Sequence, residues 1–207
     1  MNIFINNITY WLLDENIIEK EDIEIYKYGI QQGLFTIINS GITLLTGFVL
    51  GVFAQSITLL LSYIPLRMYA GGVHARTATR CFIYTHIINL SLLLSVKWIS
   101  TPNFVLWFII VFAVIIIYIF SPIEAKNKPL SKEEFQIYGN KARRILATLF
   151  CIAIFLNHIG EHKHSLCIFG TIIITSITMI CGIVVDRMET SKENNLHKYY
   201  SESHIEK

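Results

Sequence analysis

The sequence predicts an all-α protein, a polytopic membrane helical bundle with about six transmembrane segments and an interfacial helix at its N-terminus. Hydrophobic residues make up 53% of its 207 residues and charged residues only 15%, a balance more apolar than that of soluble domains. Its apolar runs approach the length of about twenty residues that crosses a hydrocarbon core of about 30 Å. Its basic residues gather in alternate connections between those runs. These observations predict a single integral-membrane domain over residues 1–207.

The N-terminal segment, residues 1–13, has no positively charged leader and no small-residue cleavage site, so it does not read as a signal peptide. On a helical projection its apolar side chains share one face: Phe4, Ile8, Trp11 and Leu12. Its polar side chains share the other face: Asn2, Asn6 and Thr9. This pattern indicates either a short helix lying at the membrane interface or a frayed terminus. We assign residues 1–28 to a cytoplasmic or interfacial segment.

The membrane-spanning part is predicted to cover residues 33–187 and to be followed by a polar, mobile cytoplasmic tail over residues 188–207. Six apolar segments are expected within it: residues 33–53, 56–68, 81–96, 104–120, 145–156 and 166–185. The second segment is short and carries Pro65, so we expect it to tilt, to thin the bilayer or to enter only part way. The fifth ends early at Asn157, His158 and Gly160, and without it the two termini would lie on opposite sides.

The distribution of Lys and Arg predicts the orientation in a bacterial cell membrane. With six spans, all but two of the 17 basic residues lie on the side of the termini and of residues 67–80 and 121–144. The two exceptions are Lys97 and Lys163. The positive-inside rule makes the side with the basic residues cytoplasmic. Thiols stay reduced there, so no disulfide framework is expected among the four cysteines.

Residues 67–81, RMYAGGVHARTATRC, carry the chemistry that the sequence suggests. His74 and Cys81 can act together if the imidazole accepts the thiol proton and the thiolate attacks a carbonyl, which predicts a cysteine endopeptidase. Seven residues of straight helix would separate the two side chains by about 10.5 Å of rise. Because glycine adopts backbone angles closed to other residues, Gly71 and Gly72 would let the chain fold back.

We therefore place His74 on a loop and Cys81 in the first turns of the next helix. The helix dipole there, together with nearby Arg76 and Arg80, would favour thiolate over thiol. A buried thiol beside a hydrogen-bonded histidine is the plain structural alternative for such a pair. No metal site or other cofactor is expected, because the remaining Cys and His residues form no zinc-ligand pattern. A net charge of +2 and no aromatic residues interleaved with the basic ones argue against nucleic acid.

At these residues the chain resembles the accessory gene regulator protein B (AgrB) family of bacterial membrane endopeptidases, which process quorum-sensing peptide precursors. The matching positions are Arg67, Gly71, Gly72, His74, Ala75 and Cys81. The resemblance extends to the alternation of spans and loops and to the proline- and lysine-bearing loop over residues 121–130. The family also has a functionally important glutamine in its first membrane segment, for which Gln31 is our choice and Gln32 the rival.

The resemblance implies a reaction and a substrate, an AgrD-like propeptide on the lipid bilayer. Cys81 would cleave the propeptide through an acyl-enzyme thioester, and a cysteine of the peptide would then close a thiolactone-type ring. Arg67 would bind substrate carboxylates, stabilise the oxyanion or anchor its helix at the interface. Members of the family are thought to pair, and a GxxxG motif at Gly47 and Gly51 offers either a homodimer contact or intramolecular packing.

The basic residues of the 121–144 loop either orient the protein or attract an acidic peptide: Lys126, Lys128, Lys132, Lys141, Arg143 and Arg144. A non-catalytic peptide transporter or export protein is the alternative function, although His86 is the only ionisable residue expected inside the spans. A zinc-dependent intramembrane protease is a third possibility. Of these three functions, the motif and the family resemblance favour the cysteine endopeptidase.

Overall fold

The structure is a computed structural model that describes residues 2–72, 78–99, 104–123 and 131–205, and these residues are almost entirely helical. Its elements in chain order are α1 (Asn2–Asp14), the 3₁₀ helix η1 (Lys20–Asp22), α2 (Ile23–Val49), α3 (Phe53–Ala70), α4 (Ala78–Trp98), α5 (Phe104–Phe120), α6 (Lys132–His158) and α7 (His162–Ile205). No strand occurs in the described ranges. The all-α prediction is confirmed.

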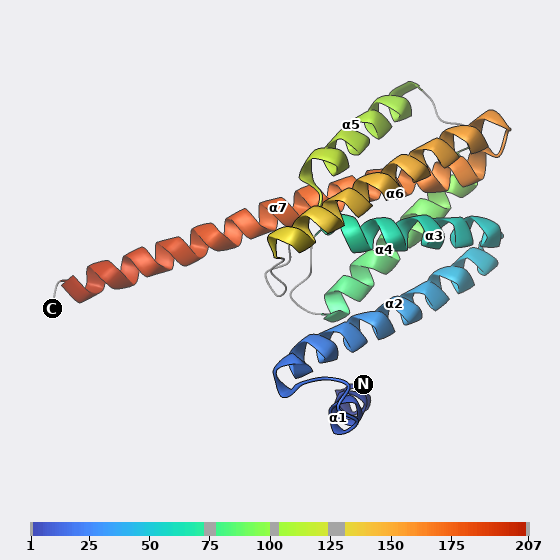
Figure 1. The fold of residues 1–207 in the computed structure, drawn as a ribbon. Helices are drawn as coiled ribbons and strands as arrows, with labels where there is room; N and C mark the ends of the chain where they lie inside the picture. The colour runs from blue at the N-terminus through green and yellow to red at the C-terminus, as the bar shows by residue number, and fades with distance from the viewer. Residues whose placement is uncertain (1, 73–77, 100–103, 124–130, 206–207) are drawn as a thin grey trace.

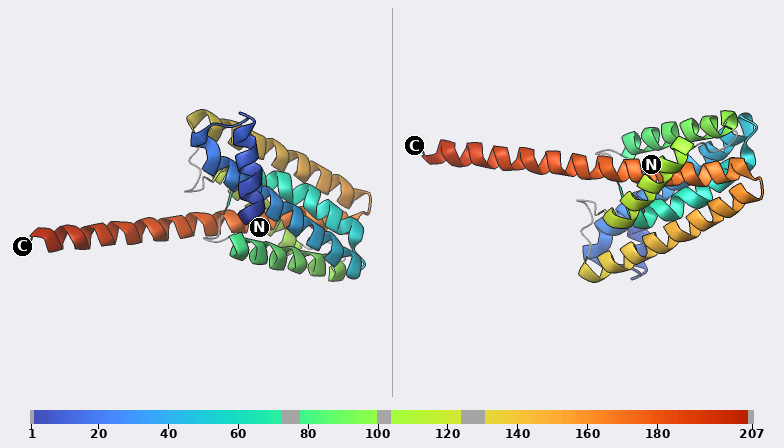
Figure 2. Two further views of the ribbon diagram at one scale, coloured as in Figure 1. Left: turned by 90° about the horizontal axis from the view of Figure 1, so that it is seen from below. Right: turned by 90° about the horizontal axis from the view of Figure 1, so that it is seen from above.

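Helices α2 to α7 form a bundle in which successive helices alternate in direction (Figure 1). At one end lie the starts of α2, α4 and α6 and the ends of α3 and α5, and at the other lie the α2–α3 and α6–α7 turns (Figure 1). Helix α7 contacts α3, α4, α5 and α6, and it continues well beyond the bundle at the first of these ends (Figure 2). We call this first end the α7-exit end.

The core of the bundle lies around the part of α7 that the other helices enclose. Phe169 of α7 is fully buried, and its ring centroid lies 5.2 Å from that of Trp107 on α5 and 6.3 Å from that of Phe150 on α6. Polar side chains also join the helices. Ser62 of α3 and Thr171 of α7 are 3.0 Å apart at their hydroxyl oxygens. Such small hydroxyl residues allow helices to approach closely in a membrane bundle.

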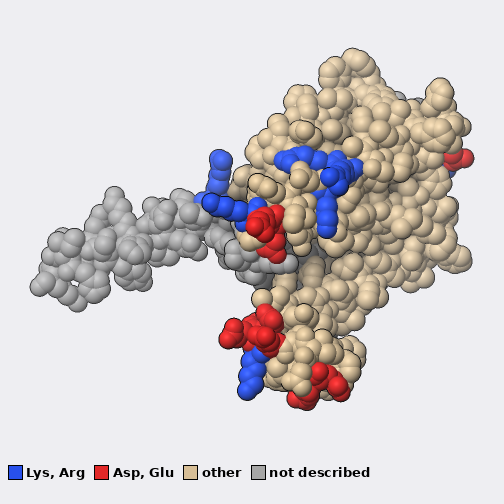
Figure 3. All heavy atoms as spheres, in the orientation of Figure 1, with Lys and Arg blue, Asp and Glu red and all other residues tan. Residues whose placement is uncertain are grey.

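The outer surface of the bundle carries large apolar side chains that are mostly exposed. Ile37 and Phe48 of α2 are 70% and 72% exposed, and Phe112 of α5 is 65% exposed. Lys, Arg, Asp and Glu gather mostly toward the α7-exit end, and the face between the two ends is largely uncharged (Figure 3). Exposed apolar area of this extent is typical of contact with lipid rather than with water.

Two of the described helical segments are long and apolar enough to cross a membrane, residues 20–49 and 162–185. Two shorter apolar helices, residues 82–98 and 104–120, accompany them. These apolar helices agree with a bundle that faces lipid. The predicted number of six spans stays a prediction.

Three helices extend beyond the limits that hydropathy predicts. Helix α2 begins at Ile23, about ten residues before its predicted span. Helix α6 begins at Lys132 because Ser131 and Glu134 form a capping box, in which the Ser131 side chain accepts from the Glu134 N–H at 3.2 Å. The mobility of residues 188–207 stays a prediction, and α7 continues through this predicted tail to Ile205. No Gly or Pro occurs between residues 183 and 205 to interrupt it.

The structure adds detail on two other helices. Helix α3 runs without a break through Pro65 for 18 residues, a length of about 27 Å, and the irregular backbone comes after it at Gly71; its tilt and depth in the bilayer stay predictions. Helix α1 exists, but one residue of its expected polar face is buried. Ile5 and Thr9 are 2% and 1% exposed, whereas Trp11 is 56% exposed. Thr9 can be buried because its hydroxyl donates to the Ile5 carbonyl at 2.8 Å.

The GxxxG motif serves packing within the chain. A Cβ atom on Gly47 of α2 would overlap the side chain of Ser56 in the first turn of α3. Gly51 lies beyond the end of α2, in the turn, with φ +72°. The two glycines therefore do not form one helix face. The α2–α3 turn needs Gly47 to be small because Ser56 packs directly against it.

We expect the substitution Gly47→Ala to destabilise the protein, because the new methyl group overlaps the Ser56 side chain. The free energy of unfolding should fall by about 1–3 kcal/mol, as is usual for overpacking. Gly41→Ala is the matched control on the same helix, since no atom lies within 4 Å of its added Cβ. Thermal unfolding in detergent measures both. A Gly47→Ala variant as stable as Gly41→Ala would contradict this account of the turn.

Candidate functional site

The residues of the 67–81 motif all lie at the α7-exit end. Arg67 is in the last turn of α3, and Gly71 is the residue that caps this helix. Helix α4 begins at Ala78, so Cys81 is its fourth residue, in the first turn. His74 and Arg76 lie outside the described residues, as does the side chain of Cys81. The two residues that we predict to be catalytic therefore stay predictions, and the structure describes what surrounds them.

The backbone at Gly71 adopts a conformation that is essentially confined to glycine. Its φ is +78° and its ψ −156°, a region that side-chain-bearing residues avoid. Its N–H still donates to the Arg67 carbonyl at 3.2 Å, and the preceding Ala70 carbonyl accepts from the Ile123 N–H at 3.0 Å. A Cβ on Gly71 would overlap the backbone of Ile123. Helix α3 therefore ends here for two reasons, the backbone angles and the close approach of the segment after α5.

The guanidinium of Arg67 turns back over this break. Its Nη1 donates to the Gly71 carbonyl and, at 3.3 Å, to the hydroxyl of Thr178 on α7. Gly72, with φ +137°, leaves open the space that the guanidinium occupies, since a Cβ there would overlap Nη1. The diglycine thus has a second function besides turning the chain. It makes room for a half-buried arginine between the ends of α3 and α7.

Helix α2 packs beside the start of α4. Phe35 and Phe82 have ring centroids 6.1 Å apart, and further along Asn89 Nδ2 donates to Thr43 Oγ1 at 3.1 Å. These two contacts show that α2 and α4 run in the same direction. Gln31 precedes Phe35 by one turn and so lies on the same face of α2, level with the first turn of α4. This register favours Gln31 over the neighbouring Gln32 as the glutamine near the motif.

Helix α6 brings basic residues against the end of α3. Tyr69 of α3 has its ring centroid 5.6 Å from that of Tyr138, and Lys141 Nζ lies 5.2 Å from the Tyr69 ring. Arg143 Nε donates to the Tyr118 carbonyl at 3.0 Å, at the end of α5. Arg143 therefore stabilises the bundle. The exposed cations of α6 are Lys132, Lys141 and Arg144, of which Lys141 contacts the motif through Tyr69.

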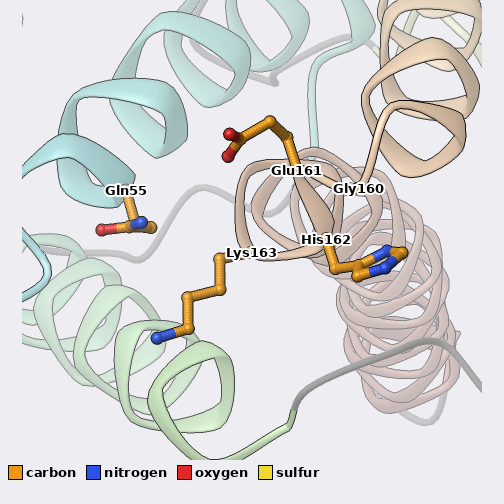
Figure 4. Close-up of a pocket in the computed structure, with 5 residues that line it drawn as sticks. All are labelled: Gln55, Gly160, Glu161, His162 and Lys163. Carbon is orange, nitrogen blue, oxygen red and sulfur yellow. The ribbon is translucent and has the colours of Figure 1, made fainter.

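A shallow pocket lies at the opposite end of the bundle, where the α6–α7 turn meets the start of α3. Its volume is about 270 Å³ and its lining residues are Gln55, Gly160, Glu161, His162 and Lys163. Glu161 and Lys163 lie on different sides of it, with Gln55 beyond them (Figure 4). About 22 Å of helix separates Gln55 from Ala70, at 1.5 Å per residue. This pocket is therefore not part of the diglycine site.

Several of the other cysteines and histidines lie away from the motif. Cys151 is exposed and Cys167 is buried, whereas the exposed Cys181 follows Thr178 by three residues on α7 and so lies toward the motif. His162 Nδ1 lies 2.9 Å from Asn157 Oδ1, and His164 Nδ1 lies 2.7 Å from Thr58 Oγ1, at the opposite end. Within the described ranges, no three His, Cys, Asp or Glu side chains come together as metal ligands.

Comparison with known proteins identifies the family. The profile of the family described as Accessory gene regulator B matches residues 5–180. The chain belongs to this family, AgrB. Membership connects it with the accessory gene regulator quorum-sensing system and with the membrane, in agreement with its apolar helices. The predicted family resemblance is confirmed.

Named relatives of this AgrB chain support the assignment. It is 28% identical over 139 residues to putative AgrB-like protein 2 of Clostridium perfringens. The matched region covers 64% of this chain and 65% of that relative. The chain is 28% identical over 142 residues to the accessory gene regulator protein B of Staphylococcus saprophyticus, covering 68% and 70%. A putative AgrB-like protein of Listeria innocua is 26% identical over 140 residues, covering 66% and 68%. No solved structure matches the chain.

Two residues next to the motif escaped the sequence analysis, Thr178 and Ile123. Thr178 belongs to a polar group inside an otherwise apolar segment, together with Thr175 and Ser176. Such a group of polar residues indicates a contact between helices, but it does not predict which residue of another helix makes that contact. Ile123 gives no sequence signal, because its contact with Ala70 is made by its backbone N–H.

We expect Gly71→Ala to destabilise this AgrB chain more than Gly51→Ala does. Both residues have positive φ, +78° and +72°, but only at Gly71 would the added Cβ overlap a neighbouring backbone. Strain alone should reduce the free energy of unfolding by about 1–2 kcal/mol, and the overlap with Ile123 adds to it at residue 71. Thermal unfolding in detergent compares the two variants. Equal losses would mean that the Ile123 contact is unimportant.

Proposed function

We propose that this AgrB chain is a membrane-embedded cysteine endopeptidase that cleaves a small quorum-sensing propeptide, with Cys81 as the nucleophile and His74 as its general base. The observation that supports this most is the break at Gly71 and Gly72. It ends α3 at Ala70, four residues before His74, while α4 starts at Ala78 so that Cys81 falls in its first turn. His74 thus belongs to the segment that joins the two helices, and Cys81 follows it in the first turn of the second helix.

The surroundings favour the reactive form of the thiol. A cysteine in the first turn of a helix lies at the positive end of the helix dipole, which stabilises a thiolate. Arg67 lies at the same end of the bundle, in the last turn of α3, and Arg76 belongs to the connecting segment. A thiol with a pKa of about 8.5 is only a few per cent ionised at neutral pH, so even a modest lowering of that pKa raises the nucleophile's population considerably.

The reaction follows from these groups. His74 takes the proton of Cys81, and the thiolate attacks the carbonyl carbon at the bond between the signal segment and the acidic tail. The imidazolium then gives its proton to the leaving amine, which releases the tail and leaves a thioester on Cys81. A cysteine thiolate of the bound peptide attacks this thioester, which closes a thiolactone ring and restores the Cys81 thiolate. Water would hydrolyse the thioester instead, so the site must exclude it.

The basic side chains of α6 suggest how the propeptide is recruited. Lys132, Lys141 and Arg144 are exposed on α6, and Lys141 lies over Tyr69 at the end of α3. There they can attract an acidic peptide tail that lies on the membrane surface. Arg143 is engaged with the end of α5. Lys126 and Lys128, outside the described residues, would extend the same patch. The amphipathic part of an AgrD-like propeptide would at the same time remain in the lipid interface.

For the topology we propose six spans, formed by α2 to α7, with the two termini and the 67–81 segment in the cytoplasm. Residues 1–28 would lie at the interface and residues 188–207 would follow the bundle. The alternating directions of the six helices (Figure 1) support this arrangement. The family resemblance further implies a homodimer. Its contact would not use Gly47, because Ser56 of the same chain packs there.

Thiol labelling tests the topology. In a chain whose native cysteines are replaced, Arg144→Cys should react with a membrane-impermeant reagent only after the cells are opened, and Lys97→Cys should react with intact cells. Lys97 is in the last turn of α4, and Arg144 is an exposed residue of α6 just before the apolar half of that helix. Labelling of both positions from the same side would contradict the six-span arrangement.

The catalytic proposal predicts the fate of a tagged propeptide expressed with the chain. Cys81→Ala and His74→Ala should each abolish cleavage, and Cys81→Ser should reduce it by at least about 100-fold because a hydroxyl is far less ionised than a thiol. Cys151→Ser, which alters an exposed cysteine on α6, is the matched control and should cleave normally. A hydroxylamine-labile adduct with the propeptide should form only when the sulfur of Cys81 is present.

Other results of this experiment would identify the competing functions. Cleavage that survives all substitutions at residues 74 and 81 would rule out the proposed pair. A propeptide that leaves the cell uncleaved would support a transporter. Inhibition by chelators would support a zinc protease.

A further inference from the structure

We propose that Thr178 is a positioning residue for the proposed cleavage, because its hydroxyl holds the Arg67 guanidinium against the diglycine turn that leads to His74. The inference rests on the proposed function and adds to it a residue on α7, nearly a hundred residues away in sequence from Cys81. By this inference α7, the central helix of the bundle, helps to set the geometry of the site. Thr178 is only 8% exposed, so it acts by positioning Arg67 and not by contact with the substrate.

The hydroxyl of Thr178 is itself oriented by α7. Its Oγ1 donates its hydrogen to the Thr175 carbonyl of the preceding turn, at 2.9 Å. A hydroxyl has one hydrogen and two lone pairs, so its lone pairs are then directed away from α7. Arg67 Nη1 donates to this oxygen at 3.3 Å. Thr178 thus presents a fixed acceptor to the guanidinium rather than a freely rotating one.

The two acceptors match the two hydrogens of Arg67 Nη1. One acceptor is the Gly71 carbonyl and the other is the Thr178 hydroxyl. A guanidinium that is partly removed from water needs partners for its N–H groups, because an unpaired buried donor is costly. With both hydrogens engaged, Nη1 fixes the position of the Gly71 carbonyl relative to α7. The direction in which the chain leaves Gly71 toward His74 follows from that position.

Without the Thr178 hydroxyl, Arg67 Nη1 would lose its hydrogen bond to α7. It would keep the one to the Gly71 carbonyl, which belongs to its own chain segment and could move with it. The diglycine would then sample other conformations, because neither residue carries a side chain that restricts it. His74 would reach Cys81 less often, and small displacements of reacting groups have large effects on rate.

The experiment compares three single variants by propeptide cleavage in detergent or liposomes. Thr178→Val removes the hydroxyl and keeps the shape, and Thr178→Ser keeps the hydroxyl. The matched control is Thr175→Val, on the same helix, because the buried Thr175 hydroxyl has no hydrogen-bond partner among the residues that the structure describes. We expect Thr178→Val to lower kcat about tenfold, as is usual for losing one hydrogen bond to a charged group. Its KM should stay unchanged, and Thr178→Ser and Thr175→Val should cleave within about twofold of the parent.

A double-variant cycle distinguishes positioning through Arg67 from a merely structural role. Thr178→Val should cause no further loss of kcat in an Arg67→Ala background, because its effect is exerted through that guanidinium. Thr178→Val with the kcat of the parent would overturn the inference, and so would an equal loss of kcat in both backgrounds. Similar losses in Thr178→Val and Thr175→Val would also overturn it, since they would reflect packing of α7.

The same cycle, measured by thermal unfolding, needs no substrate. Shifts in melting temperature for Arg67→Ala and Thr178→Val should be non-additive if the contact exists, and additive shifts would overturn the inference. Failure of the proposed function would be recognised separately, as cleavage by Cys81→Ala or no cleavage by the parent chain. The unfolding cycle would still decide whether Thr178 holds Arg67.

Discussion

The site depends on the backbone of Gly71, whose angles end α3 and direct the chain into the segment that carries His74. Those angles are confined to glycine, and they are held by contacts from three other parts of the chain. The Arg67 guanidinium binds the Gly71 carbonyl from within α3, Thr178 holds that guanidinium from α7, and Ile123 binds the Ala70 carbonyl from the segment after α5. Because each contact involves a different element, the conformation depends on the assembled bundle rather than on the local sequence.

The rest of the bundle serves to keep these elements in register. Helix α7 lies at its centre and contacts α3, α4, α5 and α6, with Phe169 packed against rings from α5 and α6. Lipid offers little driving force for apolar helices to associate, so close packing and polar contacts between helices set their positions. Gly47 against Ser56 and Ser62 with Thr171 are contacts of this kind. Their cumulative effect is to fix where α3 ends relative to α7.

Sequence patterns predicted which segments are helical more reliably than where the helices end. The apolar run over residues 104–120 coincides with α5, since hydropathy changes sharply at both of its ends. Helix α6 starts earlier than its apolar part because a capping box at Ser131 stabilises a polar first half. Thr9 was assigned to the exposed face of α1, yet it is buried with its hydroxyl bonded to its own helix. Hydropathy misses such residues because it does not record hydrogen bonds made within a helix.

The sequence by itself determined the family, the apolar helical class and the residues on which catalysis is proposed to depend, because these follow from composition and from a compact motif. Only the tertiary structure decided what surrounds that motif. Arg67 is half-buried between α3 and α7, Gly72 provides the space for it, and Thr178 comes to it from far along the chain. No local pattern encodes these contacts, because they join atoms from separate helices whose positions are set by packing throughout the bundle.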